Sequence, residues 1–434
     1  MLGAFTRAFR TPDLRKKLLF TLGIMALFRL GSLIPTPGID YTNVQTCIAT
    51  PTGGGQDLLG LVNLFSGGAL LQLSVFALGI MPYITASIIV QLLRVVIPKF
   101  EALQKEGQTG QAKLTQYTRY LTIFLAVLQA TTYVTMARNG ILFPGCSVEV
   151  IPDQSWPNLL IMILTMTAGT GLIMWIGEQI TEHGVGNGMS LLIFTSIAAS
   201  FPGAIGQIFA VDGGTTKVLI FVGLALVLTC AIVFVEQSQR RIPVQYAKRM
   251  VGRRMYGGST TYIPIKINMA NVIPVIFASS LLALPGLAAQ FSSEQDAGWI
   301  LWIQTNLMDP AASLHIAIYV VLILFFTFFY TSITFNPEDV ADNMKRYGGF
   351  IPGIRAGRPT SEYLTYVLNR ITTSGAVYLA IVALIPTLAL KAMGVANQIP
   401  FGGSSLIIVV GVGLQTVQQI NSQLQQRHYE GFLR

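Results

Sequence analysis

The 434-residue chain has few charged residues, and this scarcity excludes most soluble proteins. Only 11% of its residues are Asp, Glu, Lys or Arg, whereas 52% are hydrophobic. Soluble domains carry about 25% charged residues. A chain of this length would make about three soluble domains, but a membrane bundle uses about 20 apolar residues for each span. The composition therefore predicts one polytopic membrane domain over residues 1–434.

Cysteine and histidine are also scarce, with three residues of each. Cys47, Cys146 and Cys230 show no C-x-x-C spacing and have no histidine nearby, so a metal site or a redox motif has no support. The chain has no nucleotide-binding loop and no catalytic triad pattern. We therefore expect a protein that is not an enzyme and that needs no cofactor.

Long apolar runs, in contrast, are plentiful, and ten can be counted, most of them about long enough to cross a bilayer. The first run follows a basic stretch but is too long for a signal peptide and lacks a cleavage site after it, so we expect it to be retained. The runs cover residues 18–35, 72–97, 118–137, 158–177, 188–210, 216–235, 270–290, 312–335, 371–390 and 404–421.

Basic residues are distributed unevenly among the segments that connect these runs. If the N-terminus lies inside, the outer segments hold only three of the 28 Lys and Arg residues, namely Arg138, Lys217 and Lys391. Basic residues stay on the cytoplasmic side of a membrane. We therefore expect both termini in the cytoplasm. The pattern leaves open whether Cys47 and Cys146, both expected outside, form a disulfide.

Two segments suggest an internal repeat. Pro82–Ser87 in the second run resembles Pro274–Ser279 in the seventh, with Pro, Ile, Ala and Ser matching. Each run is the second of five, and an odd number of spans gives the halves, about 1–205 and 206–434, opposite orientations. Such inverted repeats place a functional path between the halves. Chance similarity between apolar helices, which use few residue types, is the alternative.

Residues 57–70 are moderately apolar but interrupted by Gly60, Asn63, Ser66, Gly67 and Gly68. Glycine costs about 1 kcal/mol in a helix interior, and non-helical backbone at membrane depth is tolerated only inside protein or a cavity. The segment is therefore no span. It fits about equally a short hinged helix lodged in a pore and an amphipathic helix on the outer surface.

Two inner connections are long and basic. In residues 236–270, strand-forming stretches flank Tyr256–Ser259 and predict a cytosolic hairpin. In residues 336–370, several glycines predict turns around Arg355. Retention by lipid headgroups explains ordinary basic loops, but these cations lie far from the span ends, where RNA or an acidic protein could bind them. The candidate docking cations are Arg240, Arg241, Lys248, Arg249, Arg253, Arg254 and Arg355.

Six strings spread from the second run to the last residue are long and unusual: FALGIMPYITAS (76–87), GNGMSLLIF (186–194), QRRIPVQYAKR (239–249), KINMANVIP (266–274), NPEDVADNMKRYGGFIPGIR (336–355) and YEGFLR at the end. Together they resemble the SecY family of bacterial protein-export channels. The resemblance implies an all-α polytopic fold of ten transmembrane helices, in two inverted pseudo-symmetric halves of five, with a central pore and a lateral gate.

The same resemblance implies a protein-conducting channel subunit that translocates unfolded polypeptides across the bacterial cytoplasmic membrane and inserts helices into it. The implied partners are SecE, SecG, the SecA motor ATPase, the ribosome and nascent or secretory polypeptides with signal sequences. Anionic lipids are a further partner expected from the net charge of +9.

Site residues follow from the family's motifs, position by position. An apolar pore ring would comprise Ile80, Ile84, Met189, Ile193, Ile276 and Ile408. A plug would lie within 58–70 and include Leu58, Leu61, Asn63, Phe65, Ser66, Gly67 and Gly68. At a lateral gate between spans 2 and 3 and spans 7 and 8, weak interhelical hydrogen bonds are expected from Ser87, Gln129, Ser279 and Ser280. Without the resemblance, the six ring residues would be ordinary core.

Two departures from the family pattern and two rival functions are relevant here. Met189 stands where a branched residue is usual, and Ala356 where a proline is common.

Inverted repeats also suit a secondary transporter of a small solute. Intramembrane charge, typical of such transporters, is almost limited to Arg29 and Glu178. An intramembrane protease would need a catalytic constellation, and His315 has no suitable neighbour in the sequence.

Overall fold

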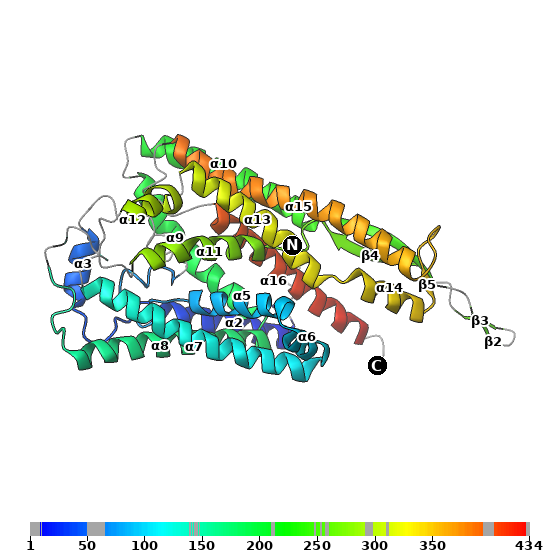
Figure 1. Cartoon of the computed structure of the whole chain (residues 1–434), viewed down its shortest axis with the longest axis horizontal. Helices are drawn as coiled ribbons and strands as arrows, with labels where there is room; N and C mark the ends of the chain where they lie inside the picture. The colour runs from blue at the N-terminus through cyan, green and yellow to red at the C-terminus, as the bar shows by residue number, and fades with distance from the viewer. Residues whose placement is uncertain are drawn as a thin grey trace.

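The computed structural model consists mainly of long helices, with a small sheet at one end (Figure 1). It describes residues 9, 11–49, 66–138, 140, 142, 146, 148–209, 213–246, 249–251, 254–256, 260–290, 298–309, 312–393 and 403–430.

Each of the ten apolar runs contains a helix over most or part of its length. The helices are α2 (Pro12–Gly31), α5 (Met81–Val96), α7 (Gln108–Arg138), α8 (Trp156–His183), α9 (Gly188–Phe209), α10 (Gly214–Gln237), α11 (Ile273–Gln290), α13 (Ser313–Thr334), α15 (Arg358–Ala392) and α16 (Gly403–Glu430). Among the described residues, five helices are long and apolar enough to cross a membrane unaided, namely α7, α8, α10, α13 extended to Arg346, and α15. A sixth candidate is α5 with α6 (Pro98–Lys105), bent by 103°. The count of ten spans itself stays a prediction.

The second run is not one continuous helix, contrary to the expectation for 72–97. Residues 67–80 form turns and a bridge, and α5 begins only at Met81. Pro82 is tolerated there because the first N–H groups of a helix have no helical partner. Pro98, which cannot continue the hydrogen-bond ladder, separates α5 from α6. The run therefore combines an irregular segment with a helix of 16 residues.

The helices form two groups that meet in the middle of the molecule. In Figure 1, α2, α5, α7 and α8 lie on one side and α10, α13 and α15 on the other, with α9, α11 and α16 between them. In the middle of the molecule, α5 contacts α11 and α9 contacts α16. One cluster of buried apolar side chains includes residues from both groups. The two inverted halves stay a prediction.

Both long basic connections contribute to one sheet. Strand β1 (Gln239–Tyr246) pairs antiparallel with β4 (Thr260–Lys266), and β2 (Arg249–Val251) pairs with β3 (Arg254–Tyr256), which confirms the predicted hairpin. The predicted position of its turn, Tyr256–Ser259, is wrong, because Tyr256 belongs to β3 and the closest pair to the turn is Val251 with Arg254. Strand β5 (Gly349–Phe350) from the other connection adds to β1, which sequence reasoning missed.

Two prolines in this sheet mark its edges. Pro243 pairs with Tyr262, and Pro264 pairs with Arg241. These two pairs are two residues apart on each strand, so they belong to the same one of the two alternating kinds of pair in an antiparallel ladder. At these positions the backbone groups point away from the partner strand, where a missing N–H costs no ladder bond. Pro264 thus interrupts the outward edge of β4, and Pro243 interrupts the part of β1 that the short β5 leaves uncovered, so both discourage pairing with other chains. Ile242, Val244 and Ile265 lie on the buried face, in a cluster with side chains of α14 (Pro337–Arg346) and α15.

The end of the molecule opposite to the sheet contains the short helix α3 (Tyr41–Ala49) (Figure 1). Cys47 in α3 forms a disulfide with Cys146, which resolves the pairing that the sequence left open. The Asp40 N–H donates to the Val150 carbonyl at 3.2 Å, and the Asn43 amide donates to the Glu149 carbonyl at 2.9 Å. Helix α12 (Gly298–Ile303) and the π-helix η1 (Gln304–Met308) precede α13.

Helix α8 packs directly against the backbone of the irregular segment, and this contact requires glycine. A Cβ at Gly169 would lie 2.0 Å from the Val75 carbonyl oxygen, whereas one at Gly171 would lie 3.6 Å from Ile123 Cδ1. We expect Gly169→Ala to lower the free energy of unfolding by about 1–3 kcal/mol through overpacking. Gly171→Ala is the matched control and should change it by no more than about 1 kcal/mol. Thermal unfolding in detergent measures both, and equal melting temperatures would contradict the packing.

Candidate functional site

The six predicted ring residues come together in one apolar cluster. Ile80, Ile84, Ile193, Ile276 and Ile408 are all buried in it, and Met189 is partly buried against it. They come from the end of the irregular segment and from α5, α9, α11 and α16, and therefore from both sides of the bundle. The structure thus brings all the predicted positions together, although their role as a ring stays a prediction.

Met189, the unusual member of this set, also contacts α8. A Cβ placed on Gly177 would lie 2.5 Å from the Met189 sulfur and 2.9 Å from its methyl carbon. The thioether therefore occupies the notch that the missing side chain of Gly177 leaves. Flexible methionine fills such irregular gaps well, which explains how it replaces a branched residue here.

Only the end of the predicted plug, Ser66–Gly68, lies within the described residues; Leu58, Leu61, Asn63 and Phe65 lie outside them. Ser66 is buried, and its hydroxyl accepts a hydrogen bond from the Leu70 N–H at 3.1 Å. Gly67 and Gly68 both have positive φ, +69° and +89°, which favours glycine. The predicted hinge therefore has a backbone conformation that L-residues rarely adopt.

This hinge lies beside the predicted ring. A Cβ on Gly67 would be 3.1 Å from the Ser196 Cα, and Ser196 follows Ile193 by about one helical turn of α9. On the other side, an Nη1 N–H of Arg29 in α2 donates to the Gly67 carbonyl. The alternative of an amphipathic helix on the outer surface does not suit this end of the segment, because Ser66 is only 1% exposed.

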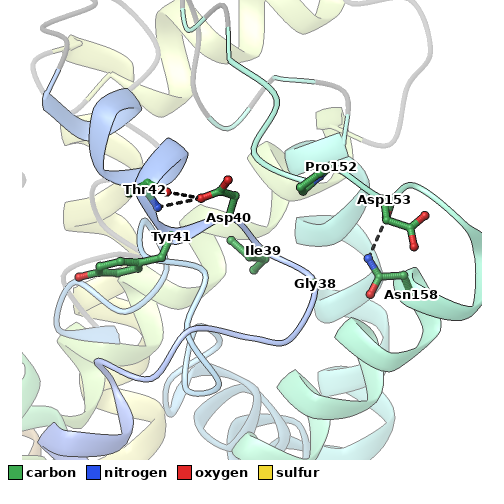
Figure 2. A pocket seen from close by; sticks show the side chains of 8 residues that line it. All are labelled: Gly38, Ile39, Asp40, Tyr41, Thr42, Pro152, Asp153 and Asn158. Atoms are coloured by element: carbon green, nitrogen blue, oxygen red, sulfur yellow. Dashed lines mark hydrogen bonds between the residues drawn. The ribbon is translucent and has the colours of Figure 1, made fainter.

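The surface has a shallow hollow of about 580 Å³ between the start of α3 and the start of α8. Figure 2 shows Asp40 and Asp153 on its walls, with Thr42 bonded to Asp40 and Asn158 bonded to Asp153. The hydrogen bond from the Thr42 hydroxyl lowers the pKa of Asp40 below its ordinary value. The Asp40 carboxylate thus accepts from the Thr42 N–H at the start of α3. The Asp153 carboxylate accepts from the Ser155 N–H before α8, whereas Asn158 bonds the Asp153 backbone carbonyl.

The predicted gate helices are adjacent, but their polar side chains do not connect them. Helix α5 contacts α11. The Ser87 hydroxyl accepts from the Gln91 amide at 3.4 Å, and Ser279 donates to the Ile276 carbonyl at 3.0 Å, so both bonds stay within one helix. Ser280 is buried without a partner in the part of the chain that the structure describes.

The expectation of interhelical bonds is therefore wrong for Ser87, Ser279 and Ser280, and none is found for Gln129 among the described residues. The physical reason is local. Ser279 reaches a carbonyl in the preceding turn of its own helix, and Ser87 is reached by the Gln91 amide from the following turn, so neither bond needs a neighbouring helix. The contact between α5 and α11 is consequently mainly apolar.

Two polar contacts between elements were missed by the sequence analysis. Arg119 in α7 forms a bidentate ion pair with Glu178 in α8, with Nε–Oε1 and Nη2–Oε2 distances of 2.8 Å each. The Asn268 amide donates to Glu236 in α10 at 2.6 Å and to the Asn271 carbonyl at 3.0 Å. The sequence did hold a signal for the Arg119–Glu178 pair, because the two opposite charges lie near the expected inner ends of neighbouring apolar runs.

The docking cations differ in how far the structure describes them. Arg240, Arg241 and Arg355 are exposed. Arg249 and Arg254 belong to β2 and β3, whereas Lys248 and Arg253 lie outside the described residues.

Arg355 lies on a tight turn, as the glycines predicted. Gly353 and Gly357 on either side have φ of +84° and +103°. The Ile354 N–H donates to the Ile351 carbonyl at 3.0 Å, and the Arg355 carbonyl accepts from the Thr360 hydroxyl at 2.9 Å. The backbone of Arg355 is thus fixed while its guanidinium projects into solvent.

Comparison with known proteins gives consistent matches over the whole chain. A family model described as SecY matches residues 74–417. The protein translocase subunit SecY of Streptomyces scabiei is 63% identical over 439 residues, and that of Mycobacterium tuberculosis (strain ATCC 25618 / H37Rv) is 57% identical over 443. Both alignments cover 100% of this chain and 100% of the relative.

Solved structures share the fold at much lower identity. A protein-conducting channel matches with a TM-score of 0.62 and 17% identity, covering 94% of this chain and 91% of that one. Sec61 in the canine ribosome-channel complex from the endoplasmic reticulum matches with a TM-score of 0.59, 16% identity and the same coverage.

The disulfide predicts the thiol count of the protein. Cys47 and Cys146 are paired and Cys230 is free, so the unfolded, unreduced chain should bind one maleimide and the reduced chain three. Cys47→Ser should bind two without reductant, because it releases Cys146. Mass spectrometry of protein denatured in SDS measures this count. Three reactive thiols before reduction would contradict the pairing.

Proposed function

This chain belongs to the SecY family of protein translocase subunits, and on that premise we propose how its residues conduct polypeptides. It is a multi-pass membrane protein and a protein-conducting channel subunit. The observation that supports the proposed site best is the meeting of the six ring residues, from five separate parts of the chain, in one cluster between the two groups of helices. The rival reading, a secondary transporter, does not fit relatives that are translocase subunits over their full length.

We propose that the ring seals the resting pore by its apolar character. A narrow collar of branched and flexible apolar side chains excludes water and ions by dewetting. The same collar grips any polypeptide without sequence-specific bonds. Polypeptides of many sequences can therefore pass, and the chain itself supplies no energy for their movement. We infer that it has no catalytic activity and is driven by a partner or by the membrane potential.

The plug and the gate complete this proposal. The segment 58–70 would close the outer side of the ring, since its described end touches α9 beside Ile193. The lateral gate would open where α5 meets α11. This seam has few polar bonds, so an apolar signal segment can separate the helices and replace their contacts with its own.

We further propose that the membrane is the bacterial cytoplasmic membrane and that both termini lie in the cytoplasm. Disulfides form in oxidising compartments outside the cytoplasm. The Cys47–Cys146 disulfide lies just beyond the end of α2 and before the start of α8, at the end opposite to the basic sheet. It therefore supports the orientation predicted from the distribution of Lys and Arg.

The basic cytoplasmic surface would bind the partners that drive transport. We propose SecA and the ribosome as these partners, SecE and SecG as companion subunits, nascent or secretory polypeptides with signal sequences as clients, and anionic lipids around the span ends. The sheet β4–β1–β5 supports this role because its strand β1 holds the exposed Arg240 and Arg241 on ordered backbone. An arginine fork binds a carboxylate or a phosphate in bidentate fashion.

The ring proposal predicts that polarity, not residue identity, controls the seal. Replacing Ile84 and Ile276 together with Asn should make the resting pore conduct ions, because amide side chains allow water into the collar. Replacing both with Leu preserves apolar character and is the matched control. Conductance of channels reconstituted without a driving partner measures the effect. Unchanged conductance in the Asn variant would show that these residues are ordinary core.

The docking proposal predicts a particular importance for Arg355. Arg355→Glu should reduce partner-driven export at least about tenfold, since a bidentate contact of about 1.5–3 kcal/mol is replaced by repulsion. Arg355→Lys should be impaired as well, because an ammonium reproduces the fork poorly. Arg346→Glu is the control, since this exposed cation ends α14 and lies on no comparable turn. Export into vesicles with matched channel abundance decides, and equal mild defects at both positions would exclude specific docking.

A further inference from the structure

Arg29 is a charged residue in a helix that is expected to lie in the membrane. It occupies the last turn of α2, and no carboxylate lies within ion-pair distance of it among the described residues. A charged side chain at membrane depth is costly and marks a functional position by default. The guanidinium is instead held by neutral oxygens, namely the Gly67 carbonyl and the Ser32 hydroxyl, the latter at 3.4 Å from Nη1.

Ser32 fixes the position of the arginine. Its hydroxyl donates to the Arg29 carbonyl at 2.7 Å, and its N–H donates to the Phe28 carbonyl at 3.1 Å, so it caps α2 while it contacts the guanidinium. Ser32 is only 1% exposed. The arginine therefore projects from a closed helix end, and not from a loose one.

The chain that follows the hinge is fixed to the same end of α2. Thr36 donates to the Leu73 carbonyl through both its N–H and its hydroxyl, at 3.1 and 2.7 Å. The Val75 N–H donates to the Ile34 carbonyl at 2.9 Å. The Phe76 ring stacks on Phe28 with 5.8 Å between centroids. Residues 73–76 are therefore part of the rigid frame.

The rotatable points lie just before this anchored part, at Gly67 and Gly68. A Cβ on Gly68 would meet nothing within 4 Å, whereas one on Gly67 would lie 3.0 Å from Arg29 Nη1 and 3.1 Å from the Ser196 Cα. Gly67 is thus enclosed between α2 and α9. The hydrogen bond from Arg29 to the Gly67 carbonyl is the directional interaction that joins α2 to the hinge.

We propose that Arg29 is a positioning residue that holds the Ser66–Gly68 hinge against α9 in the resting channel. This inference rests on the proposed plug function of the segment 58–70. A single charge-assisted hydrogen bond to a carbonyl is strong enough to bias the hinge, yet it exchanges readily with water when the hinge turns away. An ion pair with a buried carboxylate would hold the hinge more tightly and would oppose its displacement.

A cross-linking experiment tests the position of the hinge. A Cβ on Gly67 would lie 3.4 Å from the Ser196 Cβ, close to the 3.5–4.5 Å typical of disulfides. The pair Gly67→Cys and Ser196→Cys, in a chain with Cys230→Ser, should therefore cross-link under mild oxidation, at a yield that the strain of an L-residue at φ +69° lowers equally in all variants compared. Adding Arg29→Gln should lower the yield, and adding Arg29→Lys, which keeps a charged donor, should restore part of it.

Ion leak of the resting channel provides a second measurement, made in chains with native Gly67 and Ser196. Arg29→Gln should raise the leak by about tenfold, the factor that corresponds to loss of about 1.4 kcal/mol. Arg138→Gln is the control, because Arg138 is an exposed arginine at the end of α7 that contacts Gln154. Its leak should equal that of the unmodified channel. Should Arg29→Gln fail to accumulate in the membrane, Arg29→Lys gives the same test with an intermediate leak expected.

The outcomes separate this inference from the proposed plug function. If deletion of residues 63–68 raises the leak while the Arg29 variants change neither leak nor cross-linking, the inference is overturned and the plug stands. If the deletion leaves the leak unchanged, the plug assignment fails and the inference fails with it. Reduced cross-linking and raised leak in Arg29→Gln, partly restored in Arg29→Lys, support the inference.

Discussion

Backbone polar groups at membrane depth must find their partners inside the protein, and this requirement governs the arrangement around the pore. Helices satisfy it by themselves, but residues 67–80 are not helical and need enclosure. Backbone bonds to the end of α2 and close approach of α8 at Gly169 provide it. The surrounding helices are thus packed around a segment that cannot face lipid. The same enclosure leaves the segment next to the ring residues.

Rigid and exchangeable contacts are separated in this structure. Within the first group of helices, the Arg119–Glu178 pair connects α7 to α8, and the Cys47–Cys146 disulfide ties α3 to the connection before α8. Between the groups, the contacts of α5 with α11 involve no hydrogen bond among the predicted gate residues. Directed bonds hold a fixed geometry, whereas apolar contacts can be exchanged for those of another apolar helix. A channel that opens sideways needs this distribution.

At the end of the molecule that carries the basic sheet, the directed contacts are of a different kind. Short strands from two connections, far apart in the sequence, form one sheet whose apolar face packs against α14 and α15. The Asn268 bond to Glu236 fixes the chain between this sheet and α11. The connection between the sheet and α11 is therefore held in place at its centre. The prolines at positions 243 and 264 keep the sheet edges from pairing with other chains.

Hydropathy alone located the helices, because every apolar run had to be buried in lipid or protein and each contains a helix. It could not show that the second run starts with turns, since apolar composition does not distinguish a helix from an enclosed irregular segment. Motif resemblance predicted the ring positions, and the structure places these residues in one large apolar cluster. The resemblance could not predict that Ser87 and Ser279 bond within their own helices, which depends on rotamers.

The sequence by itself therefore determined the class of protein, and it nominated the candidate pore residues, because these follow from composition, spacing and motifs. The tertiary structure alone decided which residues far apart in the sequence contact one another. The pairing of Cys47 with Cys146, of Arg119 with Glu178, and of Arg29 with the Gly67 carbonyl joins positions far apart in the chain. Such contacts depend on how helices pack in three dimensions, and no local pattern encodes that packing.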